Sequence, residues 1–121
     1  MSTLERYRGE AALITGGSAG VGAALAQRLA SAGMRVALLA RSAEGLERVA
    51  APLRDDGAEV LTLPADLTRE REILAAFDRV RAEWGGVRVL INNAGHGYRA
   101  NLLGGDTQRW REMLELNVLA L

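Results

Sequence analysis

The sequence predicts an α/β fold, a doubly wound parallel sheet with helices on both of its faces. Two observations lead to this prediction. Short apolar runs alternate with longer stretches whose apolar residues recur at helical spacing, in the order β-α-β-α-β-α-β-α. The connections between these segments are short, and right-handed crossovers between parallel strands are expected. We expect an incomplete sheet of about four strands in the order 3-2-1-4.

The first half of the chain is predicted to form two strand–helix units. The apolar run at 11–14 is expected to be a short buried strand, followed by a helix over 20–32 that Gly33 ends. The second unit combines a strand at 35–40 with a helix over 43–53. Because the 35–40 run is apolar throughout, it suits a sheet covered on both faces. The inward stripes of the two helices are predicted to be Val21, Leu25 and Leu29, and Leu46, Val49 and Leu53.

The alternation continues in the second half. A third strand is predicted at 59–63, and Thr68 is the expected N-cap of a third helix that Gly85 and Gly86 end. A fourth strand is predicted at 87–91. The inward stripe of the third helix is predicted to be Ile73, Phe77, Val80 and Trp84.

A last helix is predicted after a loop at 92–105, with Asp106 or Thr107 as its N-cap, and it extends to Leu121. Its apolar residues fall on more than one face: Trp110, Leu114, Val118 and Leu121 share one stripe, and Met113 and Leu116 lie off it. A helix that is apolar on several sides is built to be buried on several sides. We therefore expect the chain to be marginally stable alone, or to form a homo-oligomer through this helix and the uncovered edge of the fourth strand.

The composition predicts one cytoplasmic domain over residues 1–121. The formal net charge of zero favours neither nucleic acid nor an anionic membrane as a partner. No apolar run approaches the roughly 18 residues of a membrane span. The chain has no cysteine, which excludes disulfides and thiolate chemistry, and no metal site is predicted. All fifteen basic residues are arginine, so this chain alone cannot run a mechanism that needs a lysine ammonium.

The stretch TGGSAGVG, Thr15 to Gly22, joins the first predicted strand to the first predicted helix. The N–H groups at the start of a helix are unpaired, and the helix dipole adds about half a positive charge there, so this turn is a natural anion site. A Walker-type phosphate loop would need a lysine, whereas Val21 follows Gly20. A tight turn without a ligand is the alternative, but the position favours cofactor binding. The residues predicted to bind are Thr15, Gly16, Ser18, Ala19, Gly20, Val21 and Gly22.

The loop resembles the cofactor loop of the short-chain dehydrogenase/reductase family, and three further segments agree in order. The last of them, Asn117-Val118, lies in the last predicted helix, where the family carries its catalytic Asn. Asp66 and Leu67 follow the third strand, where the family's Asp contacts the adenine. The segment 92–95, Asn-Asn-Ala-Gly, resembles the motif that braces the sheet and lines the cofactor. From it we expect cofactor contacts by Asn93, Ala94 and Gly95. The resemblance spans the whole chain but only about half of a typical member. It implies a Rossmann-like fold and hydride transfer between a nicotinamide and a carbonyl or alcohol substrate.

The cofactor is predicted to be NADP(H), with NAD(H) the less favoured alternative. In NAD-binding sheets a carboxylate about 20 residues past the glycines bonds the ribose 2′-OH. Here the second strand ends at Ala40 and is followed by Arg41 and Ser42. A guanidinium and a hydroxyl suit a 2′-phosphate through charge-assisted hydrogen bonds. A solvated loop arginine is the other interpretation of Arg41.

The resemblance also implies a catalytic Ser and a Tyr-x-x-x-Lys pair, and these are expected to lie beyond Leu121. Tyr7 and Tyr98 are not followed by a lysine at the fourth position. Only the catalytic Asn of the family is represented, by Asn117. We therefore expect negligible turnover from these 121 residues alone. A non-catalytic nucleotide-binding module and an interaction protein that pairs through the last helix remain as alternatives.

Overall fold

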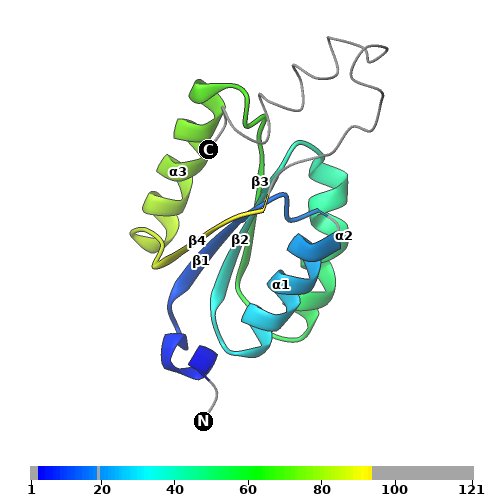
Figure 1. The fold of residues 1–121 in the computed structure, drawn as a ribbon, viewed down its shortest axis with the longest axis vertical. Coiled ribbons are helices and arrows are strands. Elements are labelled where there is room, and N and C mark those ends of the chain that lie inside the picture. Colours follow the sequence, from blue (N-terminus) through cyan, green and yellow to red (C-terminus); the bar gives the residue numbers. More distant parts are fainter. Residues whose placement is uncertain (1–2, 19, 94–121) are drawn as a thin grey trace, which may run out of the picture.

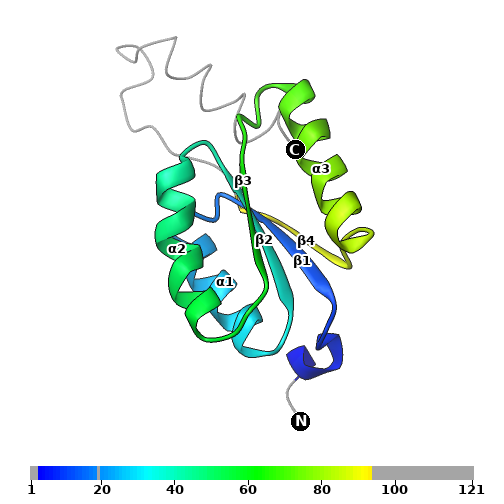
Figure 2. The same ribbon diagram turned by 180° about the vertical axis from the view of Figure 1, so that it is seen from behind.

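The computed structural model describes residues 3–18 and 20–93, and the predicted sheet is present in them (Figure 1). The elements are a 3-10 helix η1 (Thr3–Tyr7), β1 (Ala11–Thr15), α1 (Gly20–Ser31), β2 (Arg35–Ala40), α2 (Ala43–Asp55), β3 (Val60–Pro64), α3 (Glu70–Trp84) and β4 (Val89–Asn92). The strands are parallel in the order β3-β2-β1-β4, which confirms the predicted order. Helices α1 and α2 cover one face of the sheet and α3 covers the other, as the view from behind also shows (Figure 2).

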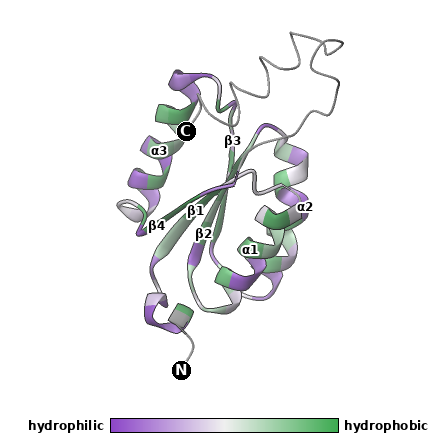
Figure 3. Ribbon diagram, viewed as in Figure 1, coloured by the Kyte–Doolittle hydropathy of each residue, from purple (hydrophilic) through white to green (hydrophobic). Residues whose placement is uncertain are grey.

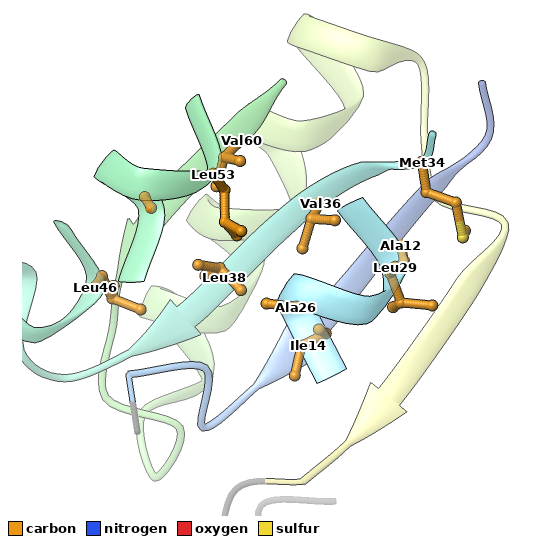
Figure 4. Packing of buried hydrophobic residues seen from close by; sticks show 11 residues of the cluster. Ala12, Ile14, Ala26, Leu29, Met34, Val36, Leu38, Leu46, Leu53 and Val60 are labelled. Carbon is orange, nitrogen blue, oxygen red and sulfur yellow. The ribbon is translucent and has the colours of Figure 1, made fainter. Parts of the chain in front are cut away.

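The core lies on both faces of the two central strands, β1 and β2. Alternate residues of a strand point to opposite faces. In β2, Leu38 therefore packs toward α1 and α2, while Leu39 packs toward α3, and both are fully buried. Figure 4 shows the first cluster, in which Ala26 and Leu29 of α1 lie against Ile14. The apolar sides of the helices point toward the sheet and their polar sides point away (Figure 3).

The predicted inward stripe of α1 is confirmed at Leu25 and Leu29 and wrong at Val21. Val21 is 67% exposed, and the buried residues of the helix are Gly22, Ala26 and Leu29. The reason is the close approach of the start of the helix to the preceding loop. A residue without a side chain must occupy the inward position there, so Val21 turns outward.

Thr68 is not the N-cap of α3, contrary to the prediction. The helix begins at Glu70, after an N-cap residue, Arg69, whose side chain makes no capping hydrogen bond. The hydroxyl and the N–H of Thr68 instead donate to Asp66 Oδ1, at 2.6 and 2.9 Å. An ionised carboxylate is a stronger acceptor than a neutral hydroxyl, so Asp66 rather than Thr68 organises the turn before the helix. The predicted C-terminal signal holds, because Gly85 ends the helix with a φ of 81°.

The remaining boundaries differ by small amounts. Strands β1 and β3 each end one residue later than predicted, and β4 starts two residues later, at Val89. Helix α2 continues to Asp55. The 3-10 helix, which was not predicted, packs Leu4 and Tyr7 against the core on the α1 side. The predicted last helix, and with it the predicted oligomer contact, lies outside the described residues. No helix in the described part of the chain combines the length and the apolar character that crossing a bilayer requires.

Candidate functional site

Four of the predicted segments come together at the carboxyl edge of the sheet. Thr15, at the end of β1, is level with Leu39 of β2 and with Asn92 of β4. Ala40, the last residue of β2, is level with Pro64 of β3. The segments that follow all four strands therefore start from one edge. In open α/β sheets, ligands bind at this edge, where the strand order reverses. Here the reversal lies between β1 and β4, and the glycine loop follows β1.

The glycine loop has a backbone that side chains would strain. Gly16 and Gly20 have φ values of 71° and 59°, in the left-handed region that glycine adopts at little cost. The N–H of Gly16 donates to Leu39 O at 2.7 Å, which ties the turn to β2. Helix α1 starts at Gly20 and has no acidic residue in its first turn, whereas α2 and α3 each have one or more. Its positive end is therefore not neutralised by a carboxylate of its own first turn.

Gly22 is the point of closest approach in the site. A Cβ built there would lie 2.3 Å from Gly16 O and 2.7 Å from Asn93 Nδ2. The first of these atoms is backbone and could not move without reshaping the loop. Asn93 Nδ2 donates to Gly16 O at 3.3 Å, so the Asn93 side chain holds the loop from the β4 side.

Thr15 joins the loop to the end of β4. Its side chain is buried, and its Oγ1 accepts a hydrogen bond from the N–H of Asn93 at 2.9 Å and donates to Ile91 O at 3.4 Å. Thr15 and Asn93 were both predicted as cofactor contacts. In the structure, their hydrogen bonds hold the glycine loop against the end of β4.

Arg41 and Ser42 lie at the start of α2. Ser42 is the N-cap of this helix, and its Oγ accepts from the N–H of Gly45 at 2.9 Å. Gly45 is a residue of the site that the sequence analysis missed. A Cβ there would lie 3.2 Å from Ser18 Cβ, so the start of α2 packs closely against the glycine loop. A glycine in the first turn of an otherwise ordinary helix is the signal that could have indicated it.

Asp66 follows β3 and lies within electrostatic range of Arg41. The hydrogen bonds from Thr68 hold the pKa of the Asp66 carboxyl below its ordinary value. Partial burial opposes this shift, and the positive charges of Arg41 and Arg69 each add a smaller lowering. The Arg69 Nε lies 3.6 Å from Asp66 Oδ2. The next residue, Leu67, is half-buried and packs against the core on the α3 side.

The lowered pKa of Asp66 predicts a pH-dependent contribution to stability. A carboxyl whose pKa is lower in the folded state stabilises that state above its unfolded pKa, and the contribution is lost as the pH falls through the folded pKa. We expect Asp66→Asn to reduce the free energy of unfolding by about 1 kcal/mol at neutral pH, as for loss of a cap. The difference from the parent should vanish in acid, below the ordinary value of 3.8. Urea unfolding at several pH values measures it, and a constant difference would contradict the assignment.

The other predicted site residues, Ala19, Ala94, Gly95 and Asn117, lie outside the described residues. Within 3–18 and 20–93, no group of three or more His, Cys, Asp or Glu side chains comes together as a metal site would require. The described part of the site thus consists of a glycine loop with left-handed residues, the positive end of a helix, an arginine and a carboxylate on one edge of the sheet.

Comparison with known proteins identifies the family. The family model described as short chain dehydrogenase matches residues 10–121. The dehydrogenase/reductase SDR family member 11 of Bos taurus is 42% identical over 120 residues, which cover 98% of this chain and 47% of that protein. This chain therefore spans about half the length of such relatives.

Solved structures agree with the sequence comparison. A short-chain type dehydrogenase/reductase from Mycobacterium marinum superposes with a TM-score of 0.91 at 30% identity, covering 99% of this chain and 49% of that one. L-sorbose reductase from Gluconobacter frateurii, solved in complex with NADPH and L-sorbose, gives a TM-score of 0.87 at 33% identity, covering 93% of this chain and 43% of that one. This chain therefore belongs to the short-chain dehydrogenase/reductase family of oxidoreductases.

Proposed function

We propose that this chain binds NADP(H) at the carboxyl edge of its sheet, for hydride transfer between a nicotinamide and a carbonyl or alcohol group of a small-molecule substrate. The observation that carries the proposal is the glycine loop, whose left-handed Gly16 and Gly20 precede a helix start without acidic residues. Such a turn offers backbone N–H groups to a diphosphate. When bound, the nicotinamide supplies or accepts the hydride.

Each part of the dinucleotide has a proposed partner in the chain. The N–H groups at the start of α1, from Gly20 to Gly22, hold the diphosphate, because those of Gly16 and Gly17 donate to Leu39 O. Asp66 and Leu67 lie at the end of β3, where the adenine ring is proposed to bind. Asn93 keeps the loop in place through its bond to Gly16 O. Ala19, Ala94 and Gly95 are proposed as further contacts on the sequence resemblance alone.

NADP(H) is proposed over NAD(H) because an arginine stands where an NAD-binding sheet carries its acid. Arg41 is exposed directly after β2, and no residue of the described part forms a salt bridge with it. Ser42 lies beside it at the start of α2, so a 2′-phosphate there would meet a guanidinium and a hydroxyl. L-sorbose reductase, a structural relative, is solved with NADPH.

We further propose that these 121 residues do not complete the chemistry. The chain contains no lysine, so it holds no Tyr-x-x-x-Lys pair, and Asn117 is the one catalytic residue that the family pattern assigns to it. We expect no carbonyl-dependent oxidation of NADPH by the purified chain, measured at 340 nm in the presence of small ketones and aldehydes. Measurable turnover that scales with protein concentration would contradict this part of the proposal.

Titration of the purified chain with NADPH and NADH tests the binding proposal directly. We expect NADPH to bind more tightly than NADH by about 10–100-fold, as a charge-assisted hydrogen bond of about 1.5–3 kcal/mol provides. Equal affinities would contradict the assignment of NADP(H). No binding of either nucleotide at millimolar concentration would instead favour the interaction module.

A further inference from the structure

The sheet has an edge at β3 whose outward peptide groups belong to alternate residues. The N–H of Val36 donates to Glu59 O, and the N–H of Ala65 donates to Ala40 O, so Glu59 and Ala65 face β2. Successive peptide groups of a strand point in opposite directions across the sheet, so the intervening alternate residues face outward. We call the outward peptide groups of Val60, Thr62 and Pro64 the β3 edge.

Arginine side chains cover two positions of the β3 edge, and a proline occupies the third. Arg54 of α2 donates from Nε and Nη2 to Val60 O, at 3.3 and 2.9 Å. Arg79 of α3 donates from Nη1 to Thr62 O at 3.4 Å. Pro64 has no N–H to offer a neighbouring strand. The two arginines reach the edge from opposite faces of the sheet, because α2 and α3 lie on opposite sides of it (Figures 1 and 2).

Arg54 is held in this position by a second set of contacts. Its Nη1 donates to Glu47 Oε2 at 2.8 Å, and the other carboxylate oxygen of Glu47 accepts from Thr62 Oγ1 at 2.9 Å. Both side chains of the ion pair are exposed, at 39% and 52%. Exposed pairs contribute little to stability. A gain in stability therefore explains the Arg54–Glu47 pair poorly. The position of Arg54 over the outward carbonyl of Val60 explains it better.

The opposite edge of the sheet lacks this cover in the described part of the chain. Val89 lies on the outward side of β4, and no described arginine donates to its peptide groups. The neighbouring Leu90 is 48% exposed, which is unusual for a leucine in a parallel sheet. Among the residues that the structure describes, the two edges therefore differ: polar side chains and a proline block β3, and no such side chain blocks β4.

We propose that Arg54, Arg79 and Pro64 close the β3 edge against pairing with the β3 of a second copy of this chain. Unpaired strand edges are templates for association, and charged side chains and prolines are the usual means of blocking them. The inference does not depend on the proposed cofactor site, which lies at the carboxyl edge.

The test is a variant of the 121-residue chain that uncovers both carbonyls, Arg54→Ala with Arg79→Ala. Amide hydrogen exchange at Val60 and Thr62 is then followed by NMR at increasing protein concentration. These two amides report on β3 itself, even if the chain also associates through another surface. We expect exchange in the variant to slow with concentration by roughly tenfold, the upper range for one added hydrogen bond. Adding Pro64→Thr, which restores an outward N–H, should increase the slowing.

The matched control is Arg48→Ala with Arg71→Ala, which removes one exposed arginine from each of the same helices and changes the net charge equally. We expect its exchange at Val60 and Thr62 to be independent of concentration, as in the parent. If the double variant does not fold, Arg79→Ala alone keeps the Arg54–Glu47 pair. In that variant, exchange at Thr62 should slow as the protein concentration rises. Folded variants with concentration-independent exchange at both amides, or the same slowing in the parent, would overturn the proposal.

Discussion

Replacing Gly22 with alanine is expected to weaken NADPH binding by about a hundredfold and to lower the free energy of unfolding by about 1–3 kcal/mol. The added Cβ would lie 2.3 Å from Gly16 O, a backbone atom of the loop proposed to hold the diphosphate. The loop must shift to admit it, and the shift also displaces the Asn93 amide that holds Gly16 O at 3.3 Å. Titration with NADPH and urea unfolding of the same samples measure the two effects.

Ala24→Val provides the control for this variant. Ala24 is exposed on the same helix, so the added bulk there contacts solvent and should cost only a few tenths of a kcal/mol of helix propensity. NADPH affinity should then equal that of the parent. If Gly22→Ala keeps the parent affinity while folding normally, the diphosphate does not bind at this loop.

The second large effect is expected from Arg41→Ala. Removing the guanidinium should weaken NADPH binding by about 10–100-fold, because a charge-assisted hydrogen bond to the 2′-phosphate is lost. NADH has no phosphate at this position, so its affinity should change little. Isothermal titration with both nucleotides separates the two cases, and added salt should reduce the difference between them.

Arg48→Ala removes the same charge from an exposed site within α2 and should leave both affinities unchanged. An equal loss of NADPH and NADH affinity in Arg41→Ala would mean that Arg41 supports the loop or the adenine region. The discrimination between the two cofactors would then have to come from another residue.

The strand order and the glycine loop could be predicted from the sequence because they depend on local patterns. Continuous apolar runs indicate buried parallel strands, and the run at 35–40 became the central strand β2. Alternation with helices then limits the topology to few choices. The loop was predictable because its glycines stand between a strand and a helix.

The errors arose where tertiary packing or a stronger local acceptor decided the outcome. Periodicity placed Val21 inward, but the contact of Gly22 with Gly16 O rotated the start of α1. Thr68 has the side chain of an N-cap, but Asp66 two residues earlier accepts its hydroxyl. The glycine at position 45 is a sequence signal, but its contact with Ser18 depends on how the start of α2 meets the glycine loop, which is tertiary packing.

The most direct test of the central claim is NMR of the isotope-labelled chain during titration with NADPH. The account predicts that the amide signals of Gly20, Val21 and Gly22 shift most, together with the Nε signal of Arg41. The amide signals at the amino ends of the strands, such as those of Gly33 and Arg35, should not shift. Shifts confined to the amino ends of the strands, or no shifts at saturating nucleotide, would contradict the claim that the diphosphate binds where α1 begins.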